Sequence, residues 1–410
     1  MKVVVSHPTG NANVRAALAG MHKAQLLAAY YTSIASFEGG LLDRIGAFGP
    51  LSEIRRRRLD SKLKAITHLS PFTEVGRLFS AKVGIANLNR HETGLFSIDS
   101  VYRNMDRRVA AQLANLKNIN AVYAYEDAAE LTFNAAKSHG LECLYDLPIG
   151  YWRAARRLLK NESERRPEWA GTLTTFKDSE AKLARKDREL LLADRIFVAS
   201  TFTAKTLQEY PGIIAPVKVI PYGFPDVGDM KQYHSLGKRP LKLLFVGGLS
   251  QRKGIAEMFA AIDKLGNHIE LTIVGKKVNE NCAALDNALA KHKWIASLPH
   301  AEILKLMKQH DVLLFPSLFE GFGLVITEAM AQGTPVITTD RTAGPDIIEH
   351  GNNGWLINAG DELELQNAIE NILTNRQLIA NTGKAAMQTA LLRPWQVYSD
   401  ELAAAIIYNN

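Results

Sequence analysis

The stretch from residue 311 to residue 335 constrains the fold of this chain more than any other. It begins with a short apolar run, Val312 to Phe315, which has the length of a buried strand. A glycine-rich turn, Glu320-Gly-Phe-Gly323, follows, and a helix begins at Leu324. A strand that leads through glycines into a helix presents free backbone N–H groups and the positive end of the helix dipole. The stretch therefore predicts an anion site, which we interpret as the site of a nucleotide-sugar diphosphate.

Strand and helix patterns alternate through the rest of the 410 residues, which predicts an α/β fold with parallel sheets. The pattern predicts a first strand at Val3 to Val5 and a helix from Val14 to Tyr30. Residues 224–240 are rich in Pro, Gly and polar residues, so we interpret them as a linker. We expect an N-terminal domain over 1–223 that binds the acceptor and a nucleotide-sugar domain over 241–393. The last helix, 394–410, is expected to pack back on the first domain.

Charge and cysteine content limit which binding partners and which cellular compartment we expect for this chain. The net charge of +7 and the pI near 9.2 favour anionic partners. Cys143 and Cys282 are the only cysteines, which argues against a disulfide framework and favours a reducing compartment. The apolar stretches are too short for a signal peptide or a membrane span. We expect a cytoplasmic protein, with peripheral attachment to the inner face of a membrane as a further candidate.

Two basic clusters lie in the first half of the chain. Arg55 to Arg58 form the centre of one run, which is either a solvated helix face or an attraction site for anionic lipid or a phosphorylated acceptor. Aromatic residues are not interleaved with this run, so we expect no nucleic-acid partner. The second cluster, Arg153 to Arg166, is either a surface helix or part of an acceptor cleft that uses arginines for phosphate.

A second turn of the same kind, Gly247 to Gly254, carries Arg252 and Lys253 where a helix starts. Ligands of open α/β sheets bind outside the carboxyl ends of the strands, where both turns lie. The two cations and the backbone amides of Phe322 to Leu324 would stabilise a diphosphate leaving group without a metal. The sequence has no Asp-x-Asp turn, no His/Cys cluster with metal-ligand spacing and no Walker A pattern. We therefore expect metal independence and no cofactor.

These residues resemble the carboxyl-terminal domain of the retaining glycosyltransferases of family four, also called group 1. The resemblance rests on Phe245 to Gly254, on two glutamates with seven residues between them, Glu320 and Glu328, on Gly333-Thr-Pro-Val-Ile and on Asp346 to Gly354. It is strong from about 241 to 357 and only topological before that. It implies the GT-B fold, in which two Rossmann-like domains with parallel sheets face each other across a cleft.

The resemblance also implies roles for single residues. Glu328 would bind the ribose hydroxyls, Glu320 would orient the donor sugar, and Lys253 would bind the diphosphate. Many family members have arginine directly after the first glycine of the earlier turn, where this chain has Gly248, and Arg252 is the expected replacement. The donor-binding residues expected in full are Gly10, Gly248, Arg252, Lys253, Gly275, Gly321, Phe322, Gly323, Leu324 and Glu328.

The acceptor side is less defined. Relatives often carry a histidine in a loop of the first domain where this chain has Tyr125-Glu126-Asp127. Glu126 and Asp127 are candidates to orient or deprotonate the acceptor hydroxyl. The alternative is an acidic pair that stabilises a helix N-terminus. His7, at the end of the first strand, is a weaker candidate for which a structural role is favoured.

These observations predict a metal-independent retaining hexosyltransferase. It would move a sugar from a nucleoside-diphosphate donor, with UDP favoured, to a hydroxyl of a glycan or glycolipid, as in polysaccharide or lipopolysaccharide biosynthesis. One alternative is a nucleotide-sugar epimerase of the same fold. Another is a basic protein without catalytic activity that binds a membrane or a polymer.

Overall fold

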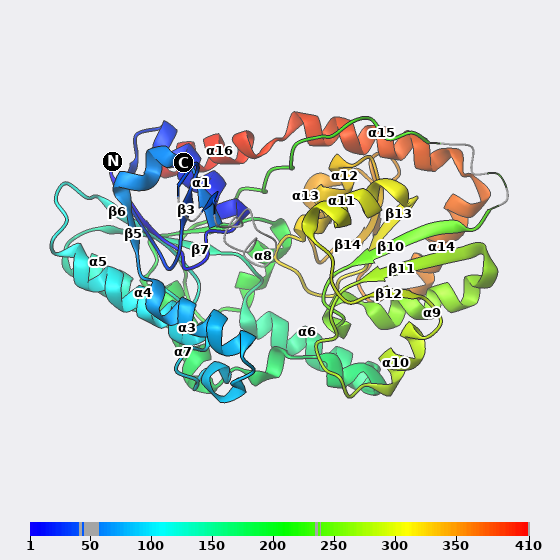
Figure 1. The fold of residues 1–410 in the computed structure, drawn as a ribbon, viewed down its shortest axis with the longest axis horizontal. Coiled ribbons are helices and arrows are strands. Elements are labelled where there is room, and N and C mark those ends of the chain that lie inside the picture. The colour runs from blue at the N-terminus through cyan, green and yellow to red at the C-terminus, as the bar shows by residue number, and fades with distance from the viewer. Residues whose placement is uncertain (41–42, 45–56, 234–236, 238, 409–410) are drawn as a thin grey trace.

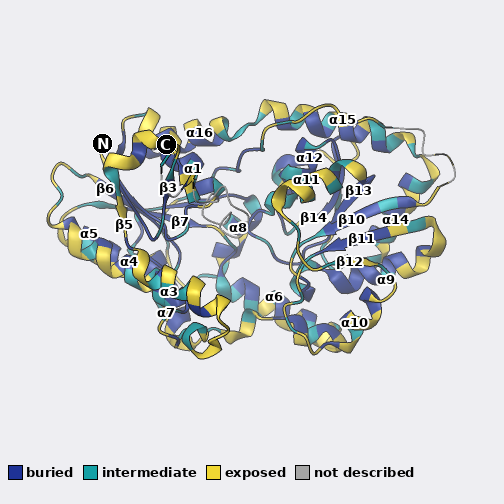
Figure 2. Ribbon diagram, viewed as in Figure 1, coloured by how far each residue is buried: buried dark blue, intermediate teal, exposed yellow. Residues whose placement is uncertain are grey.

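The computed structural model describes residues 1–40, 43–44, 57–233, 237 and 239–408. Two parallel sheets lie side by side, each flanked by helices (Figure 1). The first sheet has the strand order β5-β2-β1-β6-β7-β8-β9, and the second has the order β12-β11-β10-β13-β14-β15. The predicted α/β class with parallel sheets is confirmed. Buried strands form the centre of each sheet, and exposed helix faces form the outside (Figure 2).

The first sheet and its helices come from the first half of the chain. Its strands are β1 (Val3–Ser6), β2 (Leu27–Thr32), β5 (Thr67–Leu69), β6 (Ala121–Tyr125), β7 (Glu142–Leu147), β8 (Arg195–Val198) and β9 (Val217–Val219), with a separate pair β3 (Ser36–Phe37) and β4 (Arg58–Leu59). Its helices are α1 (Ala12–Lys23), α3 (Pro71–Lys82), α4 (Ile98–Leu113), α5 (Glu130–Ser138), α6 (Trp152–Arg165), α7 (Glu180–Leu192) and α8 (Thr201–Thr206), with 3-10 turns η2 (Ser61–Ile66), η3 (Ala86–Asn89), η4 (Pro167–Thr172), η5 (Thr175–Lys177) and η6 (Leu207–Glu209).

The second sheet follows the segment in which residues 234–236 and 238 lie outside the described part of the chain. Its strands are β10 (Leu241–Val246), β11 (Ile269–Val274), β12 (Lys293–Ile295), β13 (Val312–Phe315), β14 (Val336–Thr339) and β15 (Trp355–Ile357). The helices are α9 (Ile255–Leu265), α10 (Ala283–Leu289), α11 (His300–Gln309), α12 (Leu324–Ala331), α13 (Gly344–Ile347), α14 (Glu362–Thr374), α15 (Gln377–Leu392) and α16 (Trp395–Ile407), with 3-10 turns η7 (Gln251–Lys253) and η8 (Gly266–His268).

The helix predicted from Val14 to Tyr30 is wrong in its second half. The helix ends at Lys23, Gln25 has a positive φ of 58°, and Leu27 begins the parallel strand β2. A strand that is buried on both faces reads as a continuous apolar run, because neither face alternates with polar residues. The run from Leu26 to Tyr31 therefore fits a buried helix and a buried strand equally well.

Each sheet reverses its strand order at one place. In the second sheet β10 pairs with β11 on one side and with β13 on the other. In the first sheet β1 pairs in the same way with β2 and β6. The turns after two such central strands diverge and leave a crevice, which is where ligands bind in open α/β sheets. The turns that the sequence singled out after β10 and β13 flank this position.

The end of the chain crosses from the second sheet to the first. Helices α15 and α16 run along the top of both halves (Figure 1). Ser399 on α16 donates its hydroxyl to the carbonyl oxygen of Ala16 on α1, at 2.8 Å. A Cβ atom at Gly20 would lie 2.2 Å from the Ser399 carbonyl oxygen, so a glycine is needed for this close contact. The last helix is thereby fixed to α1.

Candidate active site

The turns after β10 and β13 are in direct contact. Gly254 has a φ of 68°, and a Cβ atom there would lie 2.0 Å from the carbonyl oxygen of Pro316. The carbonyl oxygen of Arg252 accepts hydrogen bonds from the Leu318 amide at 2.9 Å and the Ser317 hydroxyl at 3.1 Å. The two turns predicted as phosphate binders therefore form one continuous surface at the carboxyl edge of the second sheet.

Arg252 and Lys253 converge on Glu320. The Lys253 ammonium forms an ion pair with the Glu320 carboxylate, and Arg252 Nη1 lies 3.3 Å from the same oxygen. Arg252 also donates to the carbonyl oxygen of Phe319, at 2.8 Å. Burial raises the pKa of Glu320, but the charges of Lys253 and Arg252 outweigh it and hold the pKa below its usual range. Burial lowers the pKa of Lys253 more than Glu320 raises it.

The N-terminus of α12 lies next to these cations. Gly323 has a φ of 89° and immediately precedes Leu324, the first residue of the helix. A Cβ atom at Gly323 would lie 2.8 Å from the ring of Phe315, so space and backbone conformation both require glycine. The Glu320 turn thus places a helix N-terminus beside two cations, and such an arrangement favours anionic groups.

Glu328 and Gly275 lie in a different part of the same edge. His300 Nε2 lies 3.0 Å from the Glu328 carboxylate, and Trp294 donates its indole N–H to the Gly275 carbonyl oxygen at 2.9 Å. A Cβ atom at Gly275 would lie 1.8 Å from the Gly247 carbonyl oxygen, so glycine allows the β10 and β11 ends to meet. His300 and Trp294 were not foreseen, because the sequence assigned neither β12 nor α11.

The first domain contacts the Glu320 turn from the other side. Ser200 and Thr203 donate their hydroxyls to the Gly321 carbonyl oxygen, at 2.5 and 3.1 Å. A Cβ atom at Gly321 would lie 2.0 Å from the Pro148 carbonyl oxygen, and Phe322 packs against Tyr222 with ring centroids 4.9 Å apart. The turn is therefore held between the two domains.

His7 and Gly10 form a closed loop at the end of β1. His7 Nδ1 accepts hydrogen bonds from the backbone amides of Thr9 at 3.1 Å and Gly10 at 3.0 Å. The imidazole packs edge-on against Tyr125, with centroids 4.7 Å apart. Burial lowers the pKa of His7 to about 3. A neutral imidazole that accepts two backbone hydrogen bonds stabilises the loop.

Glu126 and Asp127 are paired with α7. Lys186 Nζ lies 3.1 Å from Glu126, and Arg185 Nη2 lies 2.7 Å from Asp127. Burial raises the pKa of Glu126 in spite of the Lys186 charge. Burial also opposes ionisation of Asp127, but the charges of Lys186, Lys182 and Arg185 lower its pKa. Within the described residues, neither carboxylate hydrogen-bonds to Glu320 or Lys253.

The arginines of the second basic cluster are held by carboxylates. Arg153 pairs with Asp187 at 2.6 Å on α7. Arg166 pairs with Glu362 at 2.8 Å, which connects the end of α6 to the second domain. Next to this contact lies a cavity of about 310 Å³, lined by residues of both domains: Leu158, Asn161, Glu162, Arg165, Leu318, Arg341, Ala359 and Gly360. The cluster joins the domains, and these two arginines are already ion-paired.

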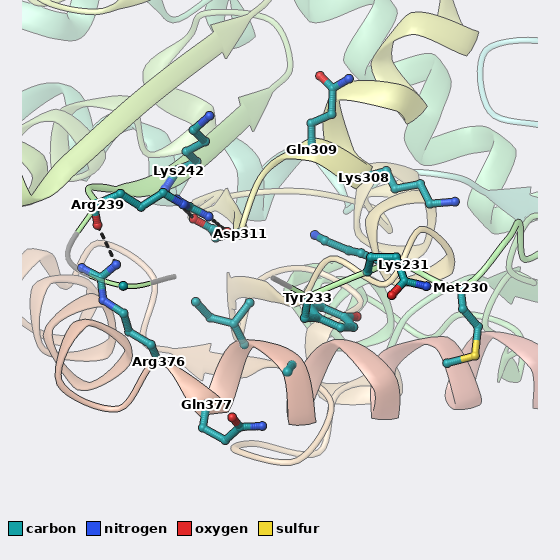
Figure 3. A pocket seen from close by; sticks show the side chains of 14 residues that line it. Met230, Lys231, Tyr233, Arg239, Lys242, Lys308, Gln309, Asp311, Arg376 and Gln377 are labelled. Carbon is teal, nitrogen blue, oxygen red and sulfur yellow. Dashed lines mark hydrogen bonds and ion pairs between the residues drawn. The ribbon is translucent and has the colours of Figure 1, made fainter. Parts of the chain in front are cut away.

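A separate cavity of about 990 Å³ lies at the amino ends of the second-sheet strands (Figure 3). Lys242 at the start of β10 and Asp311 just before β13 line it. Several of its charged side chains are used within the fold: Arg239 binds Asp311 through two bonds of 2.8 Å, and Lys231 donates to Thr334 at 2.8 Å. It lies at the edge opposite the turns after β10 and β13.

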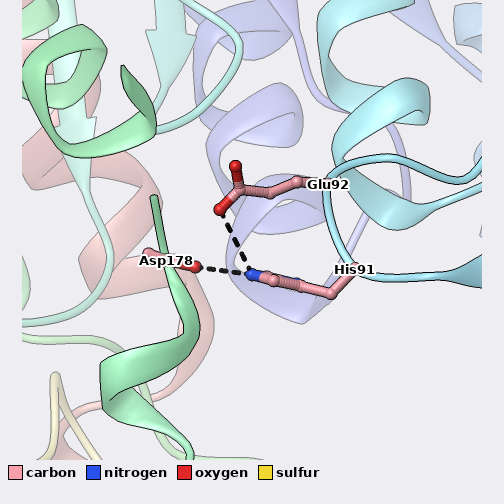
Figure 4. Close-up of side chains that lie close together, drawn as sticks. All are labelled: His91, Glu92 and Asp178. Atoms are coloured by element: carbon pink, nitrogen blue, oxygen red, sulfur yellow. Dashed lines mark hydrogen bonds and ion pairs between the residues drawn. The ribbon is translucent and has the colours of Figure 1, made fainter. Parts of the chain in front are cut away.

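His91, Glu92 and Asp178 are close enough to hold a cation (Figure 4). His91 Nε2 lies 2.9 Å from Asp178 and 3.4 Å from Glu92. Lys182 lies 3.0 Å from Asp178 and already supplies a positive charge. The group belongs to loops before α4 and α7, away from the turns after β10 and β13. Metal independence of the Glu320 site stays a prediction.

Of the first basic run, Arg55 and Arg56 lie outside the described residues. Arg57 forms an ion pair with Glu74, and Arg58 forms one with Glu38. These two side chains are thus occupied within the protein. Across the described ranges, no helix combines the length and the apolar character that crossing a bilayer requires.

Comparisons with known proteins agree with this geometry. Residues 227–389 match the family model described as "Glycosyl transferases group 1". Glycogen synthase of Mycobacterium tuberculosis is 30% identical over 156 residues, which are 36% of this chain and 38% of that protein. The matches to the first curated relatives span less than half of those proteins' length.

Solved structures match over the whole chain at low sequence identity. Sucrose-phosphate synthase from Thermosynechococcus elongatus has a TM-score of 0.65 at 16% identity, covering 99% of this chain and 98% of that one. HepE of Anabaena, solved in complex with UDP-glucose, has a TM-score of 0.63 at 16% identity and full coverage of both chains. These neighbours confirm the predicted GT-B fold.

Proposed function

The carboxyl-terminal domain belongs to the group 1 glycosyltransferases, and from that premise we propose that the chain transfers a sugar from a nucleoside-diphosphate donor to an acceptor hydroxyl. The observation that carries the proposal is the convergence of Arg252 and Lys253 on Glu320 beside the N-terminus of α12. A sugar diphosphate departs with growing negative charge. Fixed cations and helix amides that face this charge lower the barrier to its departure.

The donor-binding residues divide into two groups in this proposal. Arg252, Lys253 and the amides after Gly323 hold the diphosphate, and Glu320 orients the sugar beside them. Glu328, in the middle of α12 and in contact with His300, binds the ribose. Because this carboxylate is only partly buried, it is open to a hydroxyl donor. UDP is the favoured nucleotide, since HepE shares the fold and was solved with UDP-glucose.

Retention of the anomeric configuration and independence of metal belong to the same proposal. The two cations supply the positive charge that a divalent metal supplies in other transferases. The Lys253 side chain is 12% exposed and its ion pair with Glu320 is in place in the folded protein, so the charge is positioned in advance of the reaction. We expect transfer to continue when divalent cations are chelated.

The acceptor side is assigned to the first domain. Glu126 and Asp127 follow β6, one of the two strands at the reversal point of the first sheet, where a ligand crevice is expected. We propose that they orient the acceptor hydroxyl of a glycan or glycolipid. Their contacts with Lys186 and Arg185 would fix the direction in which they point.

The test begins with thermal unfolding in the presence of UDP-, GDP- and ADP-sugars. A ligand that binds only the folded state raises the melting temperature with concentration. Lys253→Ala and Glu328→Ala are expected to lower transfer about 100-fold or more, as removal of a preorganised contact to the leaving group does. Near-normal transfer in both variants would refute the proposal. Conversion of the nucleotide sugar without an acceptor would instead indicate an epimerase.

A further inference from the structure

Helix α3 has its apolar residues on the outside. Phe72, Val75 and Phe79 are 73%, 51% and 65% exposed, and their spacing of three and four residues places them on one face. The buried residues of this helix are polar, Glu74 and Ser80. A helix on the surface of a globular protein normally has the reverse arrangement, with apolar residues toward the core. Figure 2 shows α3 on the outer surface of the first domain.

Apolar residues around the helix extend this face. Phe96 packs edge-on against Phe72, with ring centroids 5.9 Å apart, and lines a shallow apolar groove together with α3 and Arg108. Other large apolar side chains of the same region are also exposed: Leu69, Leu78, Val83, Ile85, Leu95 and Ile98. The α3 surface is defined by the exposed residues Leu69, Phe72, Val75, Leu78, Phe79, Val83, Ile85, Leu95 and Ile98. Along the chain these residues extend from the end of β5 to the start of α4.

Positive charge surrounds the α3 surface. Five exposed basic residues lie on α3, near it in the chain or in its groove: Lys62, Lys64, Lys82, Arg90 and Arg108, whereas Arg103 and Arg107 line a separate groove with Glu130. The carboxylates Glu74, Glu92, Asp99 and Asp106 are not exposed, and the exposed Asp60, before this segment, accepts the Lys62 amide at 2.9 Å. Glu74 pairs with Arg77 at 2.7 Å, and Asp106 accepts the amides of Leu131 and Thr132 at 2.8 and 2.7 Å. An apolar face with a cationic border and no exposed carboxylate within it matches an anionic lipid surface.

We propose that the α3 surface binds the face of an anionic lipid bilayer. Its aromatic and aliphatic side chains would enter the boundary between head groups and acyl chains, and its lysines and arginines would contact the anionic head groups. A second copy of the chain fits less well, because the same five cations would face each other across a symmetric interface. No membrane-spanning helix is needed for attachment of this kind.

The position of this surface also indicates where the proposed transferase would receive its acceptor, and this step rests on the proposed function. Helix α3 starts directly after β5, and the Ser70 amide donates to the Thr32 carbonyl oxygen at the end of β2, at 2.9 Å. The α3 surface therefore begins at the same edge of the sheet as the loops after β1 and β6. A bilayer bound there would present a lipid-linked acceptor to Glu126 and Asp127.

Vesicle flotation tests the docking without any transfer reaction. The full chain is mixed with neutral phosphatidylcholine vesicles and with vesicles that also contain phosphatidylglycerol. We expect strong binding only to the anionic vesicles and weaker binding at high salt. Phe72→Ser with Phe79→Ser should weaken binding to the anionic vesicles at least about tenfold, since two aromatic side chains no longer enter the lipid. Lys82→Glu with Arg108→Glu should weaken vesicle binding more than tenfold, at about fivefold or more per cation.

The matched control is Ile213→Ser with Leu392→Ser, because these residues are 93% and 80% exposed but lie outside the α3 surface. It should bind vesicles as the unsubstituted chain does. Equal binding by all variants, or no binding of the unsubstituted chain, would overturn the proposal. So would a concentration-dependent dimer, measured by sedimentation velocity, that the Phe72 and Phe79 substitutions dissociate. Thermal shifts with nucleotide sugars, measured without vesicles, report separately on the proposed function.

Discussion

His7 shows how one buried side chain makes stability depend on pH. Its neutral ring accepts two backbone amides, and burial holds its pKa at about 3. The unfolded chain has an ordinary histidine pKa near 6.5, so between about pH 6.5 and pH 3 the unfolded state binds more protons than the folded state. The stability that His7 contributes is therefore present above pH 6.5 and is lost as the pH falls toward 3.

The prediction compares the unsubstituted chain with His7→Asn, whose side-chain oxygen is able to accept the Gly10 amide but does not titrate. Between pH 7 and pH 4 the unsubstituted chain should lose about 3 kcal/mol more of its unfolding free energy than the variant. Urea unfolding at a series of pH values measures this difference. Parallel pH profiles for the two proteins would show that the imidazole is not buried as described.

The proximity of Lys253 to Glu320 could be predicted from the sequence, whereas the pairing of Asp127 with Arg185 could not. Lys253 and Glu320 each lie in a βα turn, and the parallel-sheet topology brings such turns to one edge. Arg185 lies in the middle of a helix that precedes β8, and nothing in its local sequence sets its direction. Which cation neutralises a given carboxylate depends on tertiary packing.

At the scale of elements, Gly254 connects the start of α9 to the end of β13. Two effects act there together: a positive φ of 68° and a contact of 2.0 Å between a hypothetical Cβ atom and the Pro316 carbonyl oxygen. Gly266, at the other end of α9, allows the two effects to be measured separately. It has a positive φ of 54° but no atom within 4 Å of the position of a Cβ atom.

Gly254→Ala should therefore cost more than Gly266→Ala. Gly266→Ala is the control, and only the positive φ should lower its unfolding free energy, by about 1 kcal/mol. Gly254→Ala must also push the turn with Arg252 and Lys253 away from β13, so we expect a loss of 3 kcal/mol or more, as overpacking at a rigid contact gives. Thermal unfolding measures the stability, and calorimetry with a UDP-sugar measures the donor affinity. Equal donor affinity in both variants would mean that the contact does not position the turn.

Elements that are long or that carry glycine turns were predicted well, and short ones were not. The strand at 312–315, the start of α9 after the Gly247 to Gly254 turn, the start of α12 and the last helix α16 agree with the sequence patterns. Strands β5 and β12 have only three residues each, and their neighbours in the sheet define them more than their own residues do. Helix α3 was not assigned either, although Phe72, Val75 and Phe79 recur at the spacing of one helix face.

At the scale of the molecule, the two domains meet around Gly321. Thr203 and Ser200 donate to its carbonyl oxygen, and the Asp346 carboxylate accepts the Thr201 amide at 3.0 Å. These bonds connect the N-terminus of α8 to the loops that follow β13 and β14. The chain crosses between the domains at Phe224 and Pro394, which form an isolated parallel bridge. Rotation about this crossing would open the domains and break the contacts at Gly321 first.

Thr203→Val with Asp346→Ala should therefore favour an open arrangement of the domains. Each lost hydrogen bond removes about 1 kcal/mol from the closed arrangement, so its population relative to the open one should fall about 30-fold. Small-angle X-ray scattering should show a larger radius of gyration, and kcat/KM should fall while each domain stays folded. Thr206→Val is the control, because its hydroxyl bonds to Thr203 and Tyr151 within the first domain. It should lower the melting temperature without changing the radius. If the double variant keeps the radius of the unsubstituted chain, other contacts such as Arg166 with Glu362 hold the domains together, and opening would have to begin at α6.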